Sequence, residues 1–248
     1  MQSDTEINKP NIKFFGRRKG RVIRKAKQSL IDRFLPKIAI DVEQAGKIKE
    51  LYPFKPQKLF LEIGFGNGEH LAGQALRHKD CAFLGVEVFQ NGIANLLNLL
   101  TGIKEGDNLP DDFSLTSDRA DNVRVYADDV RLLLPSLPAE TFDKIFVLFP
   151  DPWPKKKHAP RRFINQDNLS ELTRILKKGG ILRVATDHKV YKGWALRQMT
   201  ACKNLRWTAK CSDDWRKEPA DHVQTKYQRK ALTEGRKPVF FDFEKITD

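Results

Sequence analysis

The sequence predicts an α/β fold in which a mostly parallel β-sheet carries helices on both faces and has an antiparallel C-terminal edge. From Lys58 onward, short apolar runs alternate with amphipathic segments, and this alternation is typical of βαβ units. A turn with three alternate glycines follows the first run. Acidic residues stand at or just after the ends of the first three runs, where an open parallel sheet presents its ligand-binding edge.

Hydrophobic spacing predicts the individual elements in order. The first helix contains apolar residues spaced from Leu30 to Leu35, and Pro36 marks its end or a kink. Five runs predict parallel strands, at Leu59–Ile63, Ala82–Val88, Val123–Tyr126, Lys144–Phe149 and Ile181–Ala185. Three segments predict helices, at Glu69–Arg77, Ile93–Leu100 and Leu169–Lys178, the last stopping at Gly179-Gly180. Two C-terminal runs predict antiparallel strands, at Leu205–Thr208 and Val239–Phe243.

The 248 residues suit one domain of ordinary size with an appendage. Residues 1–28 are polar and basic and are expected to form a flexible extension, whereas residues 29–248 form the α/β domain. Residues 102–121 are acidic and rich in turn formers, which predicts a long surface loop. The net charge of +13 indicates an anionic partner.

The positive charge is concentrated in two clusters. One contains eight Lys or Arg and no acid between Lys13 and Lys27, and alone it is equally compatible with a solvated tail. The other comprises Lys155, Lys156, Lys157, Arg161 and Arg162. It follows a proline-rich turn, where a merely solvated patch is not expected. We therefore expect both clusters to hold nucleic-acid phosphates, with an affinity that falls steeply with salt.

Several classes of protein are disfavoured. The three cysteines, Cys81, Cys202 and Cys211, form no CxxC pair and are read as reduced thiols, not as a disulfide framework or a metal site. No apolar stretch approaches the length of a membrane span, and the N-terminus lacks the apolar core of a secretory signal. A cytoplasmic protein without metal or membrane attachment is expected, acting as a monomer or a weak homodimer.

The turn Gly64–Gly68 lies between the first expected strand and a helix. Its alternate glycines, Gly64, Gly66 and Gly68, allow a tight turn and a close approach of the backbone to a ligand. The spacing is GxGxG, whereas nicotinamide-binding domains use GxGxxG, and Glu69 at the helix start would repel a pyrophosphate. S-adenosylmethionine, which carries a sulfonium and an ammonium, fits this turn better and is the predicted cofactor.

Acidic residues accompany this turn along the predicted sheet edge. Glu62 precedes the glycines, Glu87 ends the second strand, and Asp128 and Asp129 follow the third. Glu87 is placed to accept hydrogen bonds from ribose hydroxyls, and an acid after the third strand from an adenine amino group. A single strand-end acid is more often solvated or a helix cap. Three in register after a glycine turn favour a cofactor site.

A stiff turn follows the fourth expected strand. In the sequence FPDPWPKKK, from Phe149 to Lys157, each proline fixes its own φ and restricts the residue before it. The turn presents Asp151 and Trp153 at the carboxyl edge, and the fifth strand brings Asp187 there. Asp187 is otherwise explained as a helix cap and Trp153 as a core aromatic. A carboxylate and an indole beside lysines suit a planar base attached to phosphates.

These residues give the chain a resemblance to the bacterial tRNA (guanine-N7)-methyltransferases of the TrmB type, from about Phe14 to Phe243. The motifs that carry it are Glu62–Gly68, Glu87, Asp129, Phe149–Trp153 with Lys155, Ala185–Asp187 and Thr225–Tyr227. The resemblance implies a Rossmann-like class I methyltransferase fold over residues 29–248. It also implies transfer of a methyl group from S-adenosylmethionine to N7 of guanine 46 in the tRNA variable loop.

The resemblance further implies a role for each matching residue. Glu62, Glu87 and Asp129 would contact the cofactor together with the three glycines, Asp129 being preferred to Asp128 by its distance from the third strand. Asp151 would be the catalytic residue and would also lie near the cofactor. The substrate-binding residues would be Lys155, Asp187, Thr225, Lys226, Tyr227 and Gln228, and Trp153 is expected to stack on the base.

The chemistry of guanine N7 defines the expected role of Asp151. N7 has an in-plane lone pair and no proton at neutral pH, so no base is needed, and alignment with the methyl donor dominates. Carboxylates that accept from guanine N1–H and the amino group would orient the base and stabilise the positive charge that develops on it. Asp151 is therefore expected to orient the base and stabilise this charge, not to remove a proton.

Two positions depart from the family pattern, Tyr227 where Phe is usual and Gln228, and three other functions remain open. Gln228 stands where the family ordinarily has Glu, which removes a charge but keeps an acceptor. A nucleic-acid methyltransferase acting on an amino group is the closest alternative, although its Asp/Asn-Pro-Pro-aromatic turn is Asp-Pro-Trp-Pro here. A catalytically silent RNA-binding module would not need Glu62, Glu87 and Asp129. A nicotinamide dehydrogenase is disfavoured by Glu69.

Overall fold

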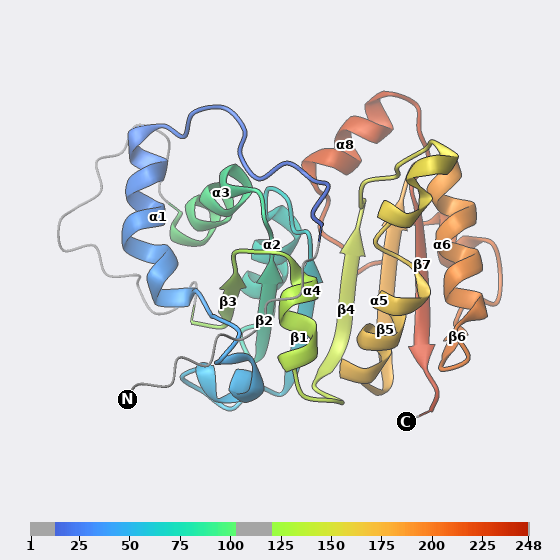
Figure 1. Ribbon diagram of the computed structural model, residues 1–248, viewed down its shortest axis with the longest axis horizontal. Helices are drawn as coiled ribbons and strands as arrows, with labels where there is room; N and C mark the ends of the chain where they lie inside the picture. Colours follow the sequence, from blue (N-terminus) through green and yellow to red (C-terminus); the bar gives the residue numbers. More distant parts are fainter. Residues whose placement is uncertain (1–12, 103–120, 248) are drawn as a thin grey trace, which may run out of the picture.

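The computed structural model describes residues 13–102 and 121–247 and contains a seven-stranded sheet in the order β3-β2-β1-β4-β5-β7-β6 (Figure 1). The strands are β1 (Lys58–Ile63), β2 (Cys81–Val86), β3 (Val123–Tyr126), β4 (Phe142–Leu148), β5 (Leu176–Thr186), β6 (Leu205–Trp207) and β7 (Val239–Lys245). The first five pair in parallel, and β7 runs antiparallel to both β5 and β6. The predicted mostly parallel sheet with an antiparallel C-terminal edge is confirmed.

Helices cover both faces of this sheet (Figure 1). The α-helices are α1 (Lys25–Ile38), α2 (Glu69–Arg77), α3 (Gln90–Thr101), α4 (Val130–Leu133), α5 (Gln166–Ile175), α6 (Lys189–Ala201), α7 (Asp213–Arg216) and α8 (Lys226–Thr233). Short 3₁₀ segments are η1 (Ala45–Leu51), η2 (Leu134–Ser136) and η3 (Lys156–Arg161). The sequence-based boundary at residues 28 and 29 falls inside α1, and the expected loop at 102–121 lies almost wholly outside the described residues.

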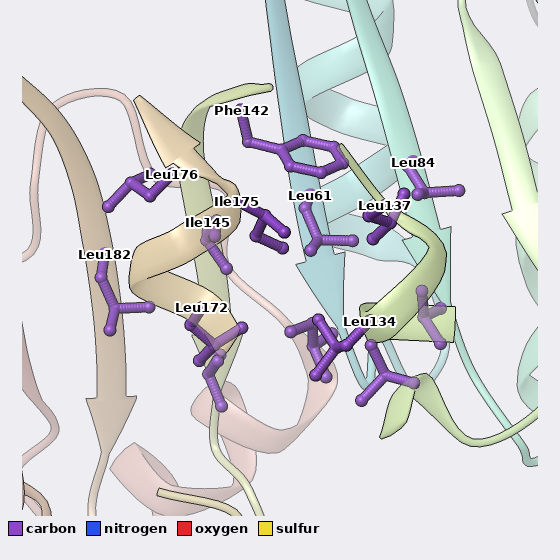
Figure 2. Close-up of a cluster of buried hydrophobic side chains, with 14 of the residues drawn as sticks. Leu61, Leu84, Leu134, Leu137, Phe142, Ile145, Leu172, Ile175, Leu176 and Leu182 are labelled. Atoms are coloured by element: carbon purple, nitrogen blue, oxygen red, sulfur yellow. The ribbon is translucent and has the colours of Figure 1, made fainter. Parts of the chain in front are cut away.

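Two apolar layers hold the helices to the sheet. On one face α1, α2 and α3 pack over β2 and β3, with Phe34, Leu71 and Leu96 fully buried. On the other, α5 and η2 pack over the middle of the sheet through a cluster of Leu, Ile and Phe side chains that includes Leu61 and Leu172 (Figure 2). Strand side chains alternate between the layers, which accounts for the near-continuous apolar runs in the sequence.

One predicted boundary is wrong. The helix expected to reach Lys178 ends at Ile175, and β5 begins at Leu176, because Leu176 is buried in the sheet and pairs with Phe142. Lys144 then pairs with Ile181, so the intervening residues of β5 bulge out of the ladder. The left-handed Gly179 (φ +75°) turns this bulge and does not cap the helix. Of the two alternatives given for Pro36, an end is excluded, because the first helix continues through Pro36 to Ile38.

Candidate active site

The glycine turn between β1 and α2 adopts the conformation its sequence requires. Gly64, Gly66 and Gly68 have φ values of +69°, +58° and +79°, a region that other residues enter only with strain. The start of α3 packs directly against this turn, since a Cβ on Gly92 would lie 2.1 Å from the Gly66 carbonyl oxygen. The turn is therefore fixed by a neighbouring helix as well as by its own glycines.

The turn borders a pocket of about 540 Å³ at the carboxyl edge of the parallel strands. Glu62, Glu87 and Asp129, the acids predicted from the sequence, all line this pocket and are all less than 10% exposed. Asp128 lines it too. The volume falls in the range of small-molecule sites. Acids at or just after the ends of three different strands thus meet in one concave site.

Glu87 organises the backbone around the glycine turn. Its Oε2 accepts from the Gly66 amide at 2.7 Å, and its Oε1 accepts from the Val88 and Phe89 amides at 2.8 and 2.9 Å. Burial raises the pKa of the carboxyl, and these three backbone amides oppose the rise. Glu87 ties the end of β2 to the turn after β1, in addition to facing the pocket.

Asp129 and Asp128 are each paired with an arginine. Asp129 caps α4, and Arg131 approaches its carboxylate with Nη2 2.5 Å from Oδ2 and Nε 3.0 Å from Oδ1. Asp128 pairs with Arg18 of the N-terminal segment, 2.7 Å between Nη1 and Oδ1. The sequence preferred Asp129 as the cofactor acid, and Asp129 is the more buried of the two.

The stiff turn after β4 carries an unusual backbone. Phe149 and Trp153 have φ values of +52° and +39°, a region in which bulky residues are rare. Each precedes a proline, which ordinarily favours an extended conformation. Strain of this kind in a non-glycine residue persists only where the surroundings enforce it, and it concentrates at functional sites.

Asp151 lies between these two strained residues and lines the pocket. Burial raises the pKa of its carboxyl, yet no hydrogen bond or ion pair holds this carboxylate within the described part of the chain. An accessible carboxylate on the pocket wall that has no partner among the described residues is available to accept hydrogen bonds from a ligand.

Arg162 is buried and donates hydrogen bonds to the backbone of the turn after β4. It is 5% exposed, and its Nη2 donates to the Trp153 carbonyl at 2.9 Å while Nε donates to the Pro152 carbonyl at 3.2 Å. Its guanidinium also lies over the ring of Trp194, at 4.6 Å. The prediction that Arg162 holds phosphate is therefore wrong, because its donors are used inside the protein.

The neighbouring Arg161 has a different environment. Its guanidinium lies 4.5 Å from the ring centre of Phe15 and 5.0 Å from that of Trp153. Lys155, Lys156 and Lys157 are exposed. The basic cluster after the turn thus divides into three solvent-facing lysines, one arginine among aromatic rings and one structural arginine.

The described part of the N-terminal segment forms a wall of the pocket. Residues 14–17 line it, and the chain before α1 runs over the carboxyl edge of the sheet (Figure 1). The Arg18 carbonyl accepts from the Gln90 amide at 3.0 Å, and the Lys13 carbonyl accepts from Arg131 at 3.2 Å. Sequence reasoning assigned this segment only its charge, because nothing local in it signals a docked conformation.

The C-terminal motif reaches the pocket through two of its four residues. Thr225 caps α8 and Tyr227 packs over the glycine turn, where a Cβ on Gly66 would lie 3.2 Å from the Tyr227 ring. Both line the pocket. Lys226 instead lines a separate basic hollow beside the N-terminal segment, and Gln228 is 1% exposed, below the surface.

Two further predicted substrate residues lie outside this pocket. Asp187 accepts from Arg236 at 2.7 Å, and its side chain is 13% exposed. Lys155 precedes η3 at the protein surface. Conversely, sequence reasoning missed Asn165 and Asn168, which line the pocket from the start of α5. The N-cap position of Asn165 before an amphipathic segment was the available signal.

The pocket chemistry suits a cationic or hydroxyl-rich ligand. Acidic side chains dominate beside the glycine turn, and α2 begins with Glu69, whose buried Oε2 has no hydrogen-bond partner within the described residues.

Across residues 13–102 and 121–247, no group of three or more His, Cys, Asp or Glu is arranged to hold a metal ion. In the same residues no helix has both the length and the apolarity to cross a bilayer.

Comparison with known sequences gives matches over most of the chain. A family model described as "Putative methyltransferase" (Methyltransf_4) matches residues 56–241. The tRNA (guanine-N(7)-)-methyltransferase of Rhodospirillum rubrum is 41% identical, covering 95% of this chain and 88% of that protein. The protein of that name from Paramagnetospirillum magneticum is 42% identical, with 92% and 91% covered. That from Agrobacterium fabrum is 39% identical, with 93% and 94% covered.

Solved structures share the architecture at low identity. The aminoglycoside resistance methyltransferase NpmB1 superimposes with a TM-score of 0.52 at 13% identity, covering 84% of this chain and 94% of that one. The 16S rRNA (adenine(1408)-N(1))-methyltransferase of Catenulisporales acidiphilia gives 0.51 at 12% identity, with the same coverage. At such identities the likeness concerns the fold alone, and it confirms the fold class predicted from the sequence.

Proposed function

The chain belongs to the tRNA (guanine-N7)-methyltransferase family, and from this premise we propose that it methylates N7 of guanine 46 in the tRNA variable loop. The observation that supports the reaction best is the single pocket in which the glycine turn and the buried acids face Asp151 and Trp153. A cofactor half and a base-binding half therefore adjoin within one cavity. A tRNA substrate also makes the cytoplasm the proposed location.

The residues of the cofactor half fit S-adenosylmethionine. The left-handed glycines allow close approach, and Glu62, Glu87 and Asp129 provide acceptors for hydroxyl, amino and ammonium groups. The acidic start of α2 disfavours a pyrophosphate-containing cofactor. When bound, S-adenosylmethionine supplies an electrophilic methyl group on its sulfonium.

The residues of the base-binding half are suited to orient a guanine so that its N7 faces the methyl donor. Asp151 is exposed on the pocket wall and unpaired within the described residues, so it is available to accept from donors on the Watson–Crick edge of guanine. Trp153 presents an aromatic face beside it, and unstacked bases in RNA commonly stack on such rings. Because N7 carries no proton, these residues need only orient the base and stabilise the charge that develops on it.

The direct test combines methyl transfer with mapping of the modified atom. Incubation with labelled S-adenosylmethionine and unmodified tRNA is expected to label the tRNA and to create one site of N7-methylguanine-specific strand scission, in the variable loop. A tRNA with adenine at position 46 serves as the control and should remain unlabelled. Labelling without scission would favour the amino-group alternative. A protein that neither labels tRNA nor binds the cofactor would be the silent RNA-binding module.

The exposed lysines after the turn are expected to contribute affinity for tRNA. Lys155, Lys156 and Lys157 are exposed, and none forms an ion pair within the described residues. Changing all three to glutamine should weaken tRNA binding. It should also make the fall of the logarithm of the association constant with the logarithm of the salt concentration shallower, by about 1 unit of slope per lost phosphate contact. Filter binding at several salt concentrations measures this slope.

A matched control separates a local contact from net charge. Lys47, Lys49 and Lys55 are exposed in and just after η1, at the opposite end of the sheet from the pocket (Figure 1). Their triple glutamine variant removes the same charge and should leave the salt slope nearly unchanged. Equal slopes in the two triple variants would show that the lysines after the turn make no specific phosphate contacts.

A further inference from the structure

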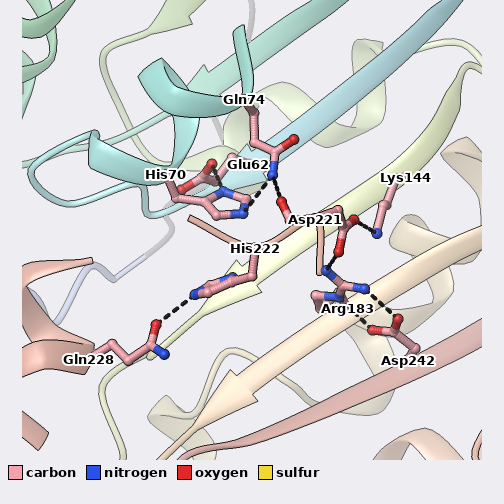
Figure 3. A network of polar contacts seen from close by, with 9 residues as sticks. All are labelled: Glu62, His70, Gln74, Lys144, Arg183, Asp221, His222, Gln228 and Asp242. Carbon is pink, nitrogen blue, oxygen red and sulfur yellow. Dashed lines mark hydrogen bonds and ion pairs between the residues drawn. The ribbon is translucent and has the colours of Figure 1, made fainter. Parts of the chain in front are cut away.

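A series of buried side-chain contacts links β1 to α8 through α2 and His222 (Figure 3). Glu62 on β1 contacts His70 on α2, with Oε2 and Nδ1 2.8 Å apart. The ring of His70 packs against the ring of His222 at a centroid distance of 4.9 Å, and His222 Nε2 lies 2.6 Å from Gln228 Oε1 on α8. His70 is 0% exposed, Glu62 3% and Gln228 1%.

The partners of His70 define its role in this series of contacts. A carboxylate only accepts, so Nδ1–H of His70 donates to Glu62. The side-chain amide of Gln74 faces the other ring nitrogen at 3.4 Å and also donates to the Asp221 carbonyl. The ring is further confined by an edge contact with Phe146, at 4.8 Å between centroids. His70 is therefore held in one orientation, with its donor directed at Glu62.

His222 continues the contacts to α8 through a neutral ring. Burial and the neighbouring His70 lower its pKa to about 4. Its Nε2–H donates to Gln228 Oε1, and Gln228 Nε2 donates to Glu218 Oε2 at 2.5 Å. A glutamate at position 228 would place two carboxylates side by side here. The amide uses both its acceptor and its donor, which explains why this chain departs from the family pattern at Gln228.

Each end of this series of contacts is a pocket residue or the neighbour of one. Glu62 lines it beside the glycine turn, and its carboxylate receives a hydrogen bond from no other donor within the described residues. Gln228 is one residue from Tyr227, which lines the pocket over Gly66. The orientation of Glu62 thus depends on His70, while His222 and Gln228 anchor the start of the helix that carries Tyr227.

We propose that His70 is a positioning residue that orients the Glu62 carboxylate toward the cofactor, and that the His222–Gln228 contact holds Tyr227 in place over the glycine turn. This inference rests on the proposed function, because it takes Glu62 as a ligand of S-adenosylmethionine. It adds that cofactor affinity depends on a side chain which does not itself line the pocket.

Two amide substitutions test the role of His70. The side-chain nitrogen of asparagine can take the place of Nδ1, whereas that of glutamine takes the place of Nε2. His70→Asn should keep the donor to Glu62 and bind S-adenosylhomocysteine within about threefold of the wild type. His70→Gln should lose the donor and raise Kd about tenfold or more, as the loss of a charge-assisted hydrogen bond implies. Calorimetry gives Kd, and thermal unfolding verifies that both variants are folded.

Kinetics and the wild-type protein supply independent measurements. KM for S-adenosylmethionine should rise in His70→Gln, while KM for tRNA stays the same. In the ¹⁵N-histidine spectrum of the wild type, the signals of a buried Nδ1–H histidine should shift when S-adenosylhomocysteine is added. Equal Kd values for the two folded variants, or a histidine spectrum unaffected by the ligand, would overturn the inference. A wild-type protein that fails to bind the ligand would instead refute the proposed function.

Discussion

Replacing Asp151 with asparagine is expected to lower kcat for tRNA methylation by about 10²- to 10³-fold, the usual cost of removing one preorganised electrostatic contact at a reacting group. Asp151 lines the pocket in a turn whose flanking residues, Phe149 and Trp153, are both left-handed. The amide keeps the shape of the side chain but removes the charge that stabilises a cationic purine. The loss should therefore appear in kcat, measured under single-turnover conditions.

Cofactor binding distinguishes this loss from a general collapse of the site. The Kd of Asp151→Asn for S-adenosylhomocysteine should remain within about threefold of the wild type, since Glu62, Glu87 and Asp129 still line the cofactor half. Asp167→Asn, which changes an exposed residue of α5 outside the pocket, serves as the matched control and should retain full turnover. Full turnover in Asp151→Asn would refute the orienting role.

Replacing Arg162 with methionine is expected to lower both kcat/KM, by about 100-fold, and the free energy of unfolding, by about 2–4 kcal/mol. The variant leaves the carbonyls of Pro152 and Trp153 without their buried donor. It also removes the guanidinium packed over Trp194. A turn held in a strained backbone conformation then relaxes, and Asp151 moves from its position. Urea denaturation and steady-state kinetics measure the two effects.

Matched substitutions distinguish the loss of the Arg162 hydrogen bonds from the loss of one positive charge. Arg197→Met removes an exposed arginine of α6 and should alter neither activity nor stability appreciably. Arg162→Lys keeps the charge but not the planar fork that reaches two carbonyls, so it should recover only part of the loss. If Arg162→Met retained wild-type kcat/KM, the turn would be held without Arg162.

The sequence was most informative where a local pattern determines the local conformation. Alternate glycines predicted the turn after β1, and strand-end acids predicted that Glu62, Glu87 and Asp129 would share one edge of the sheet. The resemblance to tRNA (guanine-N7)-methyltransferases is confirmed by relatives that match nearly the whole chain. The cofactor and substrate contacts of the individual residues stay predictions.

The structural features that the sequence did not predict depend on contacts between segments that are distant in the chain. The prolines around Phe149 and Trp153 indicated a stiff turn but not that both residues would be left-handed. The buried Arg162 donates to the Trp153 carbonyl, and the Phe149 amide donates to the Ala185 carbonyl. Nothing local distinguishes Arg162 from the lysines before it. Likewise, the docking of residues 14–17 on the pocket depends on Asp128 and Gln90, which lie far along the chain. Tertiary partners decide such features.

The antiparallel β7 has a consequence for how the polypeptide matures during synthesis. This strand lies between β5 and β6, although it is translated after both. Until residues 239–245 emerge from the ribosome, the long edge of β5 has no neighbour on that side, and an uncovered strand edge invites pairing with other chains. The edge of β5 therefore stays open to pairing with other chains until β7 has emerged, and chaperone protection would matter most up to that moment.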